Sequence, residues 1–398
     1  MKNKLSSREF NFVLILAIAL GVRQLSMSII VPFVSTYTQS LVYGTLALGG
    51  VALGIFSLSQ GIFQIPFGNL ADKIGSKKVI LIGLGLLILG LLLACISNNA
   101  YIYLLSRALQ GSGAITSAAY AWVSQKVKRD KIADSMSLIG TAQGIAYILA
   151  LGGGPLIISF IDVKDLYIAS TILVSIVFLS VLVFLKSDES QKIEKKEELV
   201  KTESTKAYLK DLISNKSFIG LILLAFITPF IGMSGFFIIP NHLDKTIGQS
   251  RLWEVLTPSV LLAIVFMKLS MKFVKRGFAK PIIIISCTSL FIGAIILFIN
   301  GNIFVSLIKS IFIFTGYTIL STLIPTVVNQ MIKSEFTGAV NGFINAFIYI
   351  GSFSGAVLTG ALWKAHSNIA LIIIFILSII ALGISILGVS KNKTKSLN

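Results

Sequence analysis

The first half of this chain resembles its second half at a fixed offset of 202 residues. Two basic residues that lie inside long apolar segments, Arg107 and Lys309, are related by that offset. Residues 140–147 (GTAQGIAY) align in the same way with residues 342–349 (GFINAFIY). A duplicated unit in a membrane gives two related halves that can move about a central site. The repeat therefore predicts the architecture of a transporter and argues against an enzyme.

Apolar segments of the length needed to cross a bilayer recur along the chain. Of its 398 residues, 55% are hydrophobic and 13% are charged, which is about half the charged fraction of an ordinary soluble protein. Each of twelve segments can cross a hydrocarbon core of roughly 30 Å as a helix. We therefore predict an all-α membrane protein with 12 transmembrane helices in two pseudo-symmetric six-helix bundles. The predicted spans are residues 12–35, 46–68, 79–97, 101–122, 133–160, 166–186, 217–240, 254–274, 281–299, 302–332, 338–362 and 369–390.

One long, charged segment separates the sixth and seventh predicted spans. Residues 187–216 are rich in Lys and Glu and poor in aromatic residues, which is typical of a linker outside the membrane. The predicted organisation is an N-terminal bundle of residues 1–186, a cytoplasmic linker of residues 187–216 and a C-terminal bundle of residues 217–398 with a short basic tail. At the end of the linker, residues 208–219 fit either a short interfacial helix or an irregular connection.

The net charge of +18 is distributed asymmetrically along the chain. With the N-terminus inside the cell, 27 of the 34 lysines and arginines fall in cytoplasmic segments or at their membrane edges. This distribution follows the positive-inside rule, so we predict a multi-pass protein of the cell (inner) membrane with both termini cytoplasmic. The charge then reflects topology and not binding to nucleic acid. The basic residues expected on the outer side are Lys164, Lys245, Arg251 and Lys364.

The loop between the second and third predicted spans carries the strongest local motif, GNLADKIGSKK over residues 68–78. One glycine permits close approach of helices and the other permits a tight turn, and the lysines hold the loop at the cytoplasmic face. The aspartate is a carboxylate at the membrane edge, where it can meet a helix N-terminus or a cation. The predicted residues of this loop are Gly68, Asp72, Lys73, Gly75, Lys77 and Lys78.

The spacing of this loop resembles the signature loop of the major facilitator superfamily (MFS). The resemblance implies the MFS fold, and it implies that Asp72 latches onto the start of the eleventh span, near Thr337-Gly338, in the outward-facing state. The offset copy, residues 270–280 (SMKFVKRGFAK), keeps the glycine of the turn but has Val274 at the position of the acid. Only the N-terminal half is therefore expected to carry the latch.

The fourth predicted span contains LSRALQGSGA at residues 105–114. A guanidinium inside a membrane costs at least a few kcal/mol unless it is solvated or paired, so Arg107 is a functional candidate. It either biases the protonation of a nearby acid or binds an anionic group of the substrate. The segment resembles the RxxQGxGA motif of drug/proton antiporters, which implies that Gln110 and Gly111 act beside Arg107. The other cations expected within spans are Arg23 and Lys309.

The fifth predicted span contains a glycine-rich motif that runs from Gly144 to the pair Gly154-Pro155. A Gly-Pro step bends a helix because Pro lacks a donor and clashes with the preceding turn. The segment resembles the antiporter motif of the same exporters, although LIIS follows the proline where the family pattern ends in two glycines. Residues 20–155 together resemble the YajR-like branch of the drug/proton antiporters, whose extra C-terminal soluble domain has no counterpart in this sequence.

Uncharged polar side chains at inward positions of the predicted helices are candidates for a substrate cavity. Gln143 and Asn345 occupy equivalent sites in the two repeats, and so do Tyr147 and Tyr349. Such pairs fit a shared binding site near the midplane, or they hold spans together through interhelical hydrogen bonds. The full set is Gln24, Tyr37, Gln143, Tyr147, Tyr317, Asn329, Asn345 and Tyr349.

None of the 16 acidic residues falls clearly in the middle of a predicted span. Three accounts remain open: Asp72, Asp134 or an outer-edge acid couples protons from a shallow position; the cavity is electropositive and the substrate anionic; or transport is uncoupled. The leading expectation is a secondary active transporter that exports a small organic compound in exchange for protons by rocker-switch alternating access. The alternative is an importer, anion transporter or lipid flippase of the same fold.

The sequence contains no motif for a catalytic nucleophile, a metal site or direct ATP drive. We therefore expect no enzyme activity, no metal and no cofactor, with a proton gradient as the source of energy. The expected partners are a small-molecule substrate and the lipid bilayer, without nucleic acid, and the chain is expected to act as a monomer.

Overall fold

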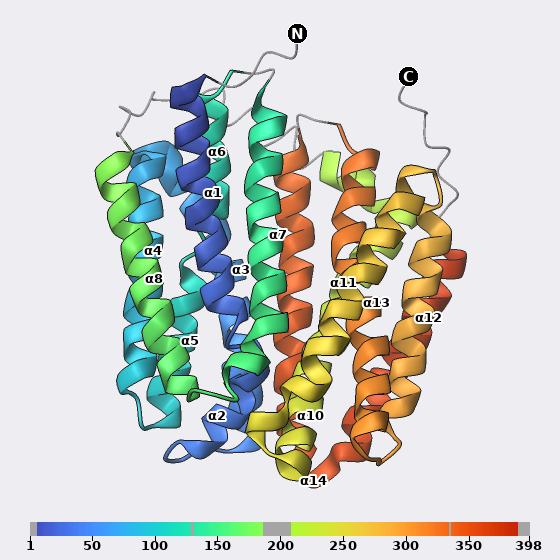
Figure 1. Ribbon diagram of the computed structural model, residues 1–398. Helices are drawn as coiled ribbons and strands as arrows, with labels where there is room; N and C mark the ends of the chain where they lie inside the picture. The colour runs from blue at the N-terminus through green and yellow to red at the C-terminus, as the bar shows by residue number, and fades with distance from the viewer. Residues whose placement is uncertain (1–5, 129–130, 186–207, 334–335, 389–398) are drawn as a thin grey trace. The chain divides into compact units, whose positions relative to one another are not determined.

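A computed structural model describes residues 6–128, 131–185, 208–333 and 336–388. Helices account for most of these residues, and no β-strand occurs among them beyond an isolated bridge (Figure 1). An apolar chain in lipid must satisfy its backbone polar groups within each segment, and a helix does so. The prediction of an all-α protein is confirmed.

The helices follow one another closely along the described chain. In the first part they are α1 (Ser7–Ser28), η1 (Val31–Phe33), α2 (Val34–Ser40), α3 (Leu46–Ile74), α4 (Ser76–Ile96), α5 (Ala100–Ser112), α6 (Thr116–Lys126), α7 (Ile132–Ile157) and α8 (Val163–Phe184). In the second part they are α10 (Lys216–Ile247), η3 (Gln249–Arg251), α11 (Trp253–Lys275), α12 (Ala279–Leu297), α13 (Ile303–Met331) and α14 (Thr337–Leu387).

By length and apolar character, ten helices of the described chain can cross a membrane. The fourth predicted span is absent from this set because it is divided into α5 and α6, which are 13 and 11 residues long. The eleventh and twelfth predicted spans are counted together because they form one element, α14. A total of twelve spans fits these observations.

The interruption between α5 and α6 was not expected from the sequence, which predicts one span over residues 101–122. Gly113 has φ −71° and ψ 50°, outside the helical region, and it ends α5. Its backbone lies so close to α4 that a Cβ on Gly113 would come within 2.5 Å of the Gly83 carbonyl oxygen. Small residues at both positions allow this approach, and the chain leaves the helical path there.

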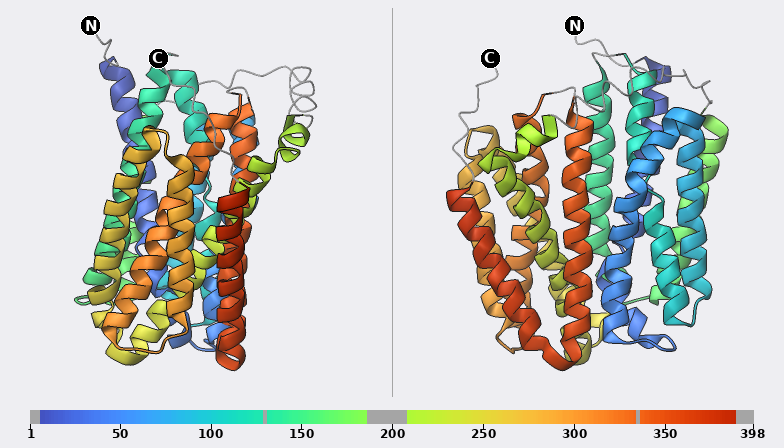
Figure 2. Two further views of the ribbon diagram at one scale, coloured as in Figure 1. Left: turned by 90° about the vertical axis from the view of Figure 1, so that its right-hand side faces the viewer. Right: turned by 180° about the vertical axis from the view of Figure 1, so that it is seen from behind.

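α14 contains one residue, His366, whose φ of −140° and ψ of 46° depart from a helix. Figure 2 shows α14 as two rods that meet in a bend. The sequence predicts a short loop between residues 362 and 369, and this bend takes its place.

The chain forms two compact units. The first consists of residues 1–45 and 55–193, and the second of residues 46–54 and 194–398. In the first unit α1 packs against α7 and α8, and α4 packs against α5 and α8. In the second unit α14 packs against α10 and α12, and α13 packs against α10, α11 and α12. The bundle limits predicted from the sequence stay a prediction.

The internal repeat is visible in the backbone of two turns. Gly75, between α3 and α4, and Gly277, between α11 and α12, both have a φ of 92°. L-residues rarely adopt this conformation, whereas glycine adopts it readily. The two glycines related by the 202-residue offset therefore serve the same local purpose in the two units.

Most of the predicted linker, residues 187–207 of 187–216, lies outside the described residues. Residues 208–213 are helical, and α10 begins at Lys216 with Asn215 as its N-cap. The segment predicted over residues 208–219 is thus a short helix followed by a break. The Tyr208 ring stacks on Phe336 with centroids 4.1 Å apart, which ties this helix to the start of α14 within the second unit.

Candidate functional site

Two arginines are buried in the first unit, each with 1% of its surface exposed. Arg107 lies near the middle of α5, where its Nη1 donates to Gln110 Oε1 over 2.6 Å. Its guanidinium also lies over the Phe56 ring of α3, 4.9 Å from the centroid. An amide oxygen and an aromatic face both stabilise a cation in a place without water. These contacts fix the position of the charge inside the helix bundle.

Gln110 connects Arg107 to the rest of its helix and to α4. The Gln110 Nε2 donates to Ser106 Oγ over 3.0 Å and to the Gly90 carbonyl oxygen over 3.4 Å. The amide therefore presents its oxygen to the guanidinium and its nitrogen to neutral acceptors. This arrangement holds the amide in one orientation and positions Arg107.

Gly111 allows α5 to approach α3 closely. A Cβ on Gly111 would collide with the backbone carbonyl group of Phe56, whose ring lies under the Arg107 guanidinium. Glycine at this position therefore sets the distance between the arginine and the aromatic ring. The role that sequence resemblance implied for Gly111 is a packing role in the structure.

Arg23 of α1 reaches the same region from another helix. Its Nε donates to the Gly113 carbonyl oxygen over 2.9 Å, at the interruption between α5 and α6. The last carbonyl groups of a helix carry partial negative charge and need donors. Arg23 supplies one, and it joins the motif of the fourth predicted span to the first helix. Next to it, Gln24 donates to Ser28 Oγ over 2.8 Å.

Three tyrosines gather about one helical turn before Arg107. Tyr103 of α5 is hydrogen-bonded through its hydroxyl to the hydroxyl of Tyr167 on α8. The Tyr37 ring of α2 packs against both, with its centroid 5.2 Å from that of Tyr103 and 6.0 Å from that of Tyr167. Of the three, sequence reasoning selected only Tyr37. The four-residue spacing from Arg107 is the signal that could have pointed to Tyr103.

In the second unit the buried cation is Lys309 of α13, with 5% of its surface exposed. Its Nζ donates to the Ile299 carbonyl oxygen over 3.3 Å, in the connection between α12 and α13. α13 begins at Asn302, whose side chain accepts from the backbone N–H groups of Phe304 and Val305. Lys309 thus lies about two turns into α13, and its ammonium group points back toward the N-terminal start of the helix.

The residues of the antiporter-like segment lie on α7. Gly154 packs against α1 so closely that a Cβ would come within 2.8 Å of the Ile29 carbonyl oxygen. A Cβ on Gly144 would meet nothing within 4 Å, so its lack of a side chain is not a packing requirement. Pro155 lies inside α7, two residues before its end at Ile157, so the helix lacks the hydrogen bond that an N–H group at this position would donate to the Leu151 carbonyl oxygen.

The candidate cavity residues are placed in several environments. Gln143, Tyr147, Asn345 and Tyr349 are all partly exposed, the first two on α7 and the others on α14. Tyr317 of α13 is also partly exposed, with its ring centroid 6.2 Å from that of Phe236. Asn329 is exposed near the end of α13 and accepts from Asn341 over 2.9 Å.

The loop motif forms the end of α3, the turn at Gly75 and the start of α4. Lys77 Nζ donates to the Leu182 carbonyl oxygen over 2.8 Å, so it caps the end of α8. A Cβ on Gly68 would make an ordinary contact of 3.7 Å with Ser117 Oγ, so this position does not require glycine for packing. Lys73 and Lys78 are exposed. The side chain of Asp72 lies outside what the structure describes, and Thr337-Gly338 forms the start of α14.

Long apolar helices around buried, oriented cations define a polytopic membrane transporter. Residues 16–356 match the model of the Major Facilitator Superfamily, and the chain belongs to this family. It is accordingly a transporter and not an enzyme. The resemblance predicted from the loop and span motifs is confirmed.

Known relatives cover most of the chain. It is 27% identical over 345 residues to the inner membrane transport protein YajR of Escherichia coli, covering 85% of this chain and 74% of YajR. It is 23% identical over 410 residues to multidrug resistance protein 2 of Bacillus subtilis, covering 100% of both. Its fold is similar to that of a mutant of the nucleoside transporter NupG, with a TM-score of 0.74, 14% identity and coverage of 94% and 99%.

Proposed function

We propose that this protein exports a small organic compound in exchange for protons by alternating access. The observation that carries the proposal is the buried Arg107–Gln110 pair with the Phe56 ring beneath it. A positive charge fixed in this way favours the ionised form of any acid that comes near it, and so it can regulate when that acid gives up its proton.

The proton-carrying acid in this proposal lies toward a membrane edge. Asp134, in the first turn of α7, is exposed and therefore within reach of water. Asp72 lies in the last turn of the long helix α3, and its role as a latch stays part of the proposal. The fixed arginine then acts on the energetics of the cycle without releasing or taking up a proton itself, because a guanidinium stays protonated.

Efflux is favoured over uptake because of the relatives. A protein of Bacillus subtilis that matches the whole chain is named for multidrug resistance. The bilayer and one small molecule are then the partners, with the proton gradient as the source of energy, in the inner membrane with both termini cytoplasmic. The cavity residues proposed from the sequence, among them Gln143 and Tyr147, would contact the substrate.

A pH measurement inside proteoliposomes tests this proposal. The purified chain is reconstituted with a pH-sensitive dye inside, and neutral, cationic and anionic compounds are added outside one at a time. The expected result is movement of protons that requires a particular compound and that is lost in Arg107→Ala. Uptake of labelled compound without any movement of protons would refute the antiport mechanism.

A second function, transport of an anionic compound, is favoured by one further observation. The second unit also buries a cation, Lys309, so both units place positive charge inside the membrane. Cations in a place of low dielectric attract an anion strongly. In the same proteoliposomes, uptake of anionic compounds alone, reduced in Lys309→Met, would favour this function over drug efflux.

A further inference from the structure

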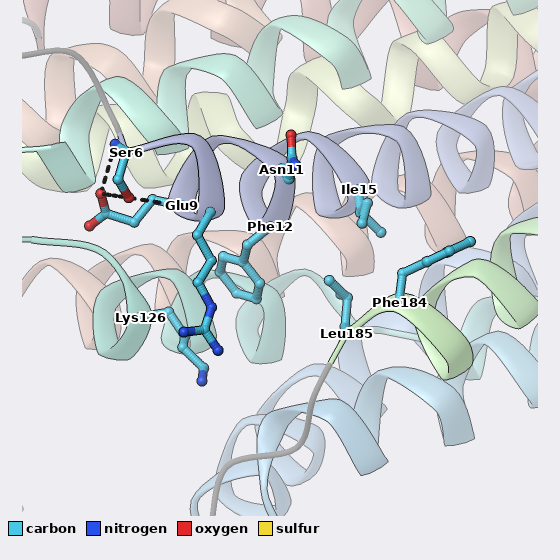
Figure 3. Close-up of a pocket in the computed structure, with 9 residues that line it drawn as sticks. Ser6, Glu9, Asn11, Phe12, Ile15, Lys126, Phe184 and Leu185 are labelled. Atoms are coloured by element: carbon cyan, nitrogen blue, oxygen red, sulfur yellow. Dashed lines mark hydrogen bonds between the residues drawn. The ribbon is translucent and has the colours of Figure 1, made fainter.

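A groove of about 650 Å³ lies at one end of the first unit, between the start of α1, the end of α6 and the end of α8. Its rim carries the cationic side chains of Arg8 and Lys126. The rest of its wall combines the polar residues Ser6, Glu9 and Asn11 with the apolar residues Phe12, Ile15, Phe184 and Leu185. Figure 3 shows Phe12 and Lys126 on one side of the groove and Leu185 and Phe184 on the other. A polar end and an apolar end thus belong to one concave surface.

Glu9, the acid at the rim of the groove, accepts hydrogen bonds from neighbouring residues of the protein. Glu9 accepts from the Ser6 backbone N–H over 3.0 Å and from the Ser6 hydroxyl over 2.6 Å, as the capping box of α1. Its other oxygen accepts from the Lys128 backbone N–H over 3.3 Å. Figure 3 places this carboxylate at Ser6, at the opposite end of the group from Phe184. The neutral donors do not cancel its charge, so the two cations Arg8 and Lys126 and the one carboxylate of Glu9 leave one net positive charge at the rim.

The apolar end of the groove opens onto a surface of the kind that faces lipid. Phe184 is 69% exposed, and it continues a stripe of exposed apolar side chains along α8. Ile172, Ile176, Leu179 and Val183 of this stripe follow helical spacing on one face of α8. An exposed stripe of this kind on a membrane helix contacts acyl chains, so a molecule in the groove has its apolar part in continuity with the bilayer.

We propose that this groove binds one anionic phospholipid. The phosphate of its headgroup lies at Arg8 and Lys126, and an acyl chain lies along Phe12 and Phe184. Basic pockets between membrane helices recognise anionic headgroups in this way, because charge attraction and burial of a chain act together. A free phosphate compound would use only the rim. The proposal is independent of what the protein transports.

The chain carries its own reporter for this site. The Trp122 ring packs edge-on against Phe12 with centroids 5.0 Å apart, just behind the wall of the groove. In the variant Trp253→Phe/Trp363→Phe, Trp122 is the remaining tryptophan of the sequence's three. This full-length variant is placed in phosphatidylcholine nanodiscs that contain increasing fractions of phosphatidylglycerol brominated on its acyl chains. We expect saturable quenching of Trp122 at a low fraction of brominated phosphatidylglycerol, and much weaker quenching by brominated phosphatidylcholine.

Charge-removing variants decide whether the rim recognises the headgroup. Arg8→Gln with Lys126→Gln should weaken the apparent affinity roughly 25-fold, from the contribution of two basic residues near an anionic surface. The matched control is Lys78→Gln, which removes an exposed lysine at the start of α4, outside the groove. Equal quenching by both lipids, or the same affinity after loss of both rim cations, would overturn the proposal.

A second measurement keeps the test independent of tryptophan replacement. Native mass spectrometry of the wild-type chain, titrated with phosphatidylglycerol in detergent, should show one lipid retained more tightly than the rest and lost in the Arg8→Gln/Lys126→Gln variant. Glycerol phosphate without acyl chains should not displace it at equal concentration. Displacement by glycerol phosphate would show that a free phosphate group is the ligand, which would contradict the lipid assignment.

Discussion

Arg107 and Lys309 occupy equivalent positions in the two repeats, but their surroundings differ. Arg107 contacts the Gln110 amide at 2.6 Å and the Phe56 ring at 4.9 Å, deep in the side-chain packing of α5. Lys309 contacts a backbone carbonyl at 3.3 Å, in the connection before its own helix. Both units therefore bury a cation at the equivalent position, but a side-chain amide and an aromatic ring orient the arginine, whereas a backbone carbonyl oxygen accepts from the lysine.

In the turns between α3 and α4 and between α11 and α12, the backbone is the same in both units, but a side chain next to the turn differs. Gly75 and Gly277 share the same φ of 92°, so the backbone has been kept in both units. The acid of the first turn, Asp72, has Val274 as its counterpart, and Val274 is buried. Together the two comparisons show that the two units share backbone features of the repeat, while the side chains at equivalent positions differ.

The largest expected effect is that of Arg107→Ala, which removes a buried charge and its bond to Gln110. A hydrogen bond to a charged group contributes about 1.5–3 kcal/mol, so we expect the initial rate of substrate-driven transport to fall about a hundredfold. Arg107→Lys should restore only part of it, because an ammonium lacks the planar set of donors. Rates in proteoliposomes, corrected for inserted protein, measure this. An unchanged rate and pH profile would remove Arg107 from the mechanism.

Next come Gly75→Ala and Gly277→Ala, which test whether the two turns are equivalent. Each should lower the free energy of unfolding by about 1–3 kcal/mol, because alanine is strained at this φ. Thermal unfolding in detergent measures the effect. Gly85→Ala in α4 is the control, since a Cβ there meets nothing within 4 Å. A loss of stability at one turn alone would show that the backbones of the repeats have diverged.

A smaller effect is expected for Asp72→Asn, which tests the difference between the two loops. The variant should insert in the membrane normally and transport about tenfold more slowly, as expected for the loss of one charged interaction of about 1.4 kcal/mol. Asp211→Asn, at an exposed acid of the short helix before α10, is the control. Wild-type turnover in Asp72→Asn would exclude the latch.

The smallest expected effect is that of Lys309→Met. Because the ammonium group's hydrogen bond to the Ile299 carbonyl oxygen is long, at 3.3 Å, its loss should change transport of neutral or cationic compounds less than about threefold. Counterflow of labelled compounds in proteoliposomes measures it. A loss as large as that of Arg107→Ala would mean that both repeats contribute equally, contrary to the contrast between their surroundings.

Much of the fold could be predicted from the sequence because lipid imposes a simple rule on apolar segments. The ends of α4, α7, α11 and α13 lie within three residues of the predicted spans. The interruption after Ser112 could not be predicted in this way. It depends on the contact between Gly113 and Gly83, which are distant in sequence, and hydropathy does not record such contacts.

The buried cations could also be predicted, since a charge within an apolar segment is evident in the sequence. Their partners could be predicted only where they lie one turn away, as Gln110 does from Arg107. The bond between Arg23 and the Gly113 carbonyl oxygen joins residues 90 positions apart, and the hydroxyl contact of Tyr103 joins it to another helix. Such pairings require the three-dimensional packing.

The short lengths of α5 and α6 have a consequence for how the chain is made. A segment that enters the membrane on its own needs about 17–25 apolar residues, and these helices have 13 and 11. We therefore expect α5 and α6 to enter the membrane together as one span, with the non-helical residues between them. Synthesis proceeds from the N-terminus, so Arg23 has left the ribosome before the carbonyl of Gly113 is made. The hydrogen-bond donor, Arg23, is therefore already synthesised when its acceptor, the Gly113 carbonyl oxygen, is made.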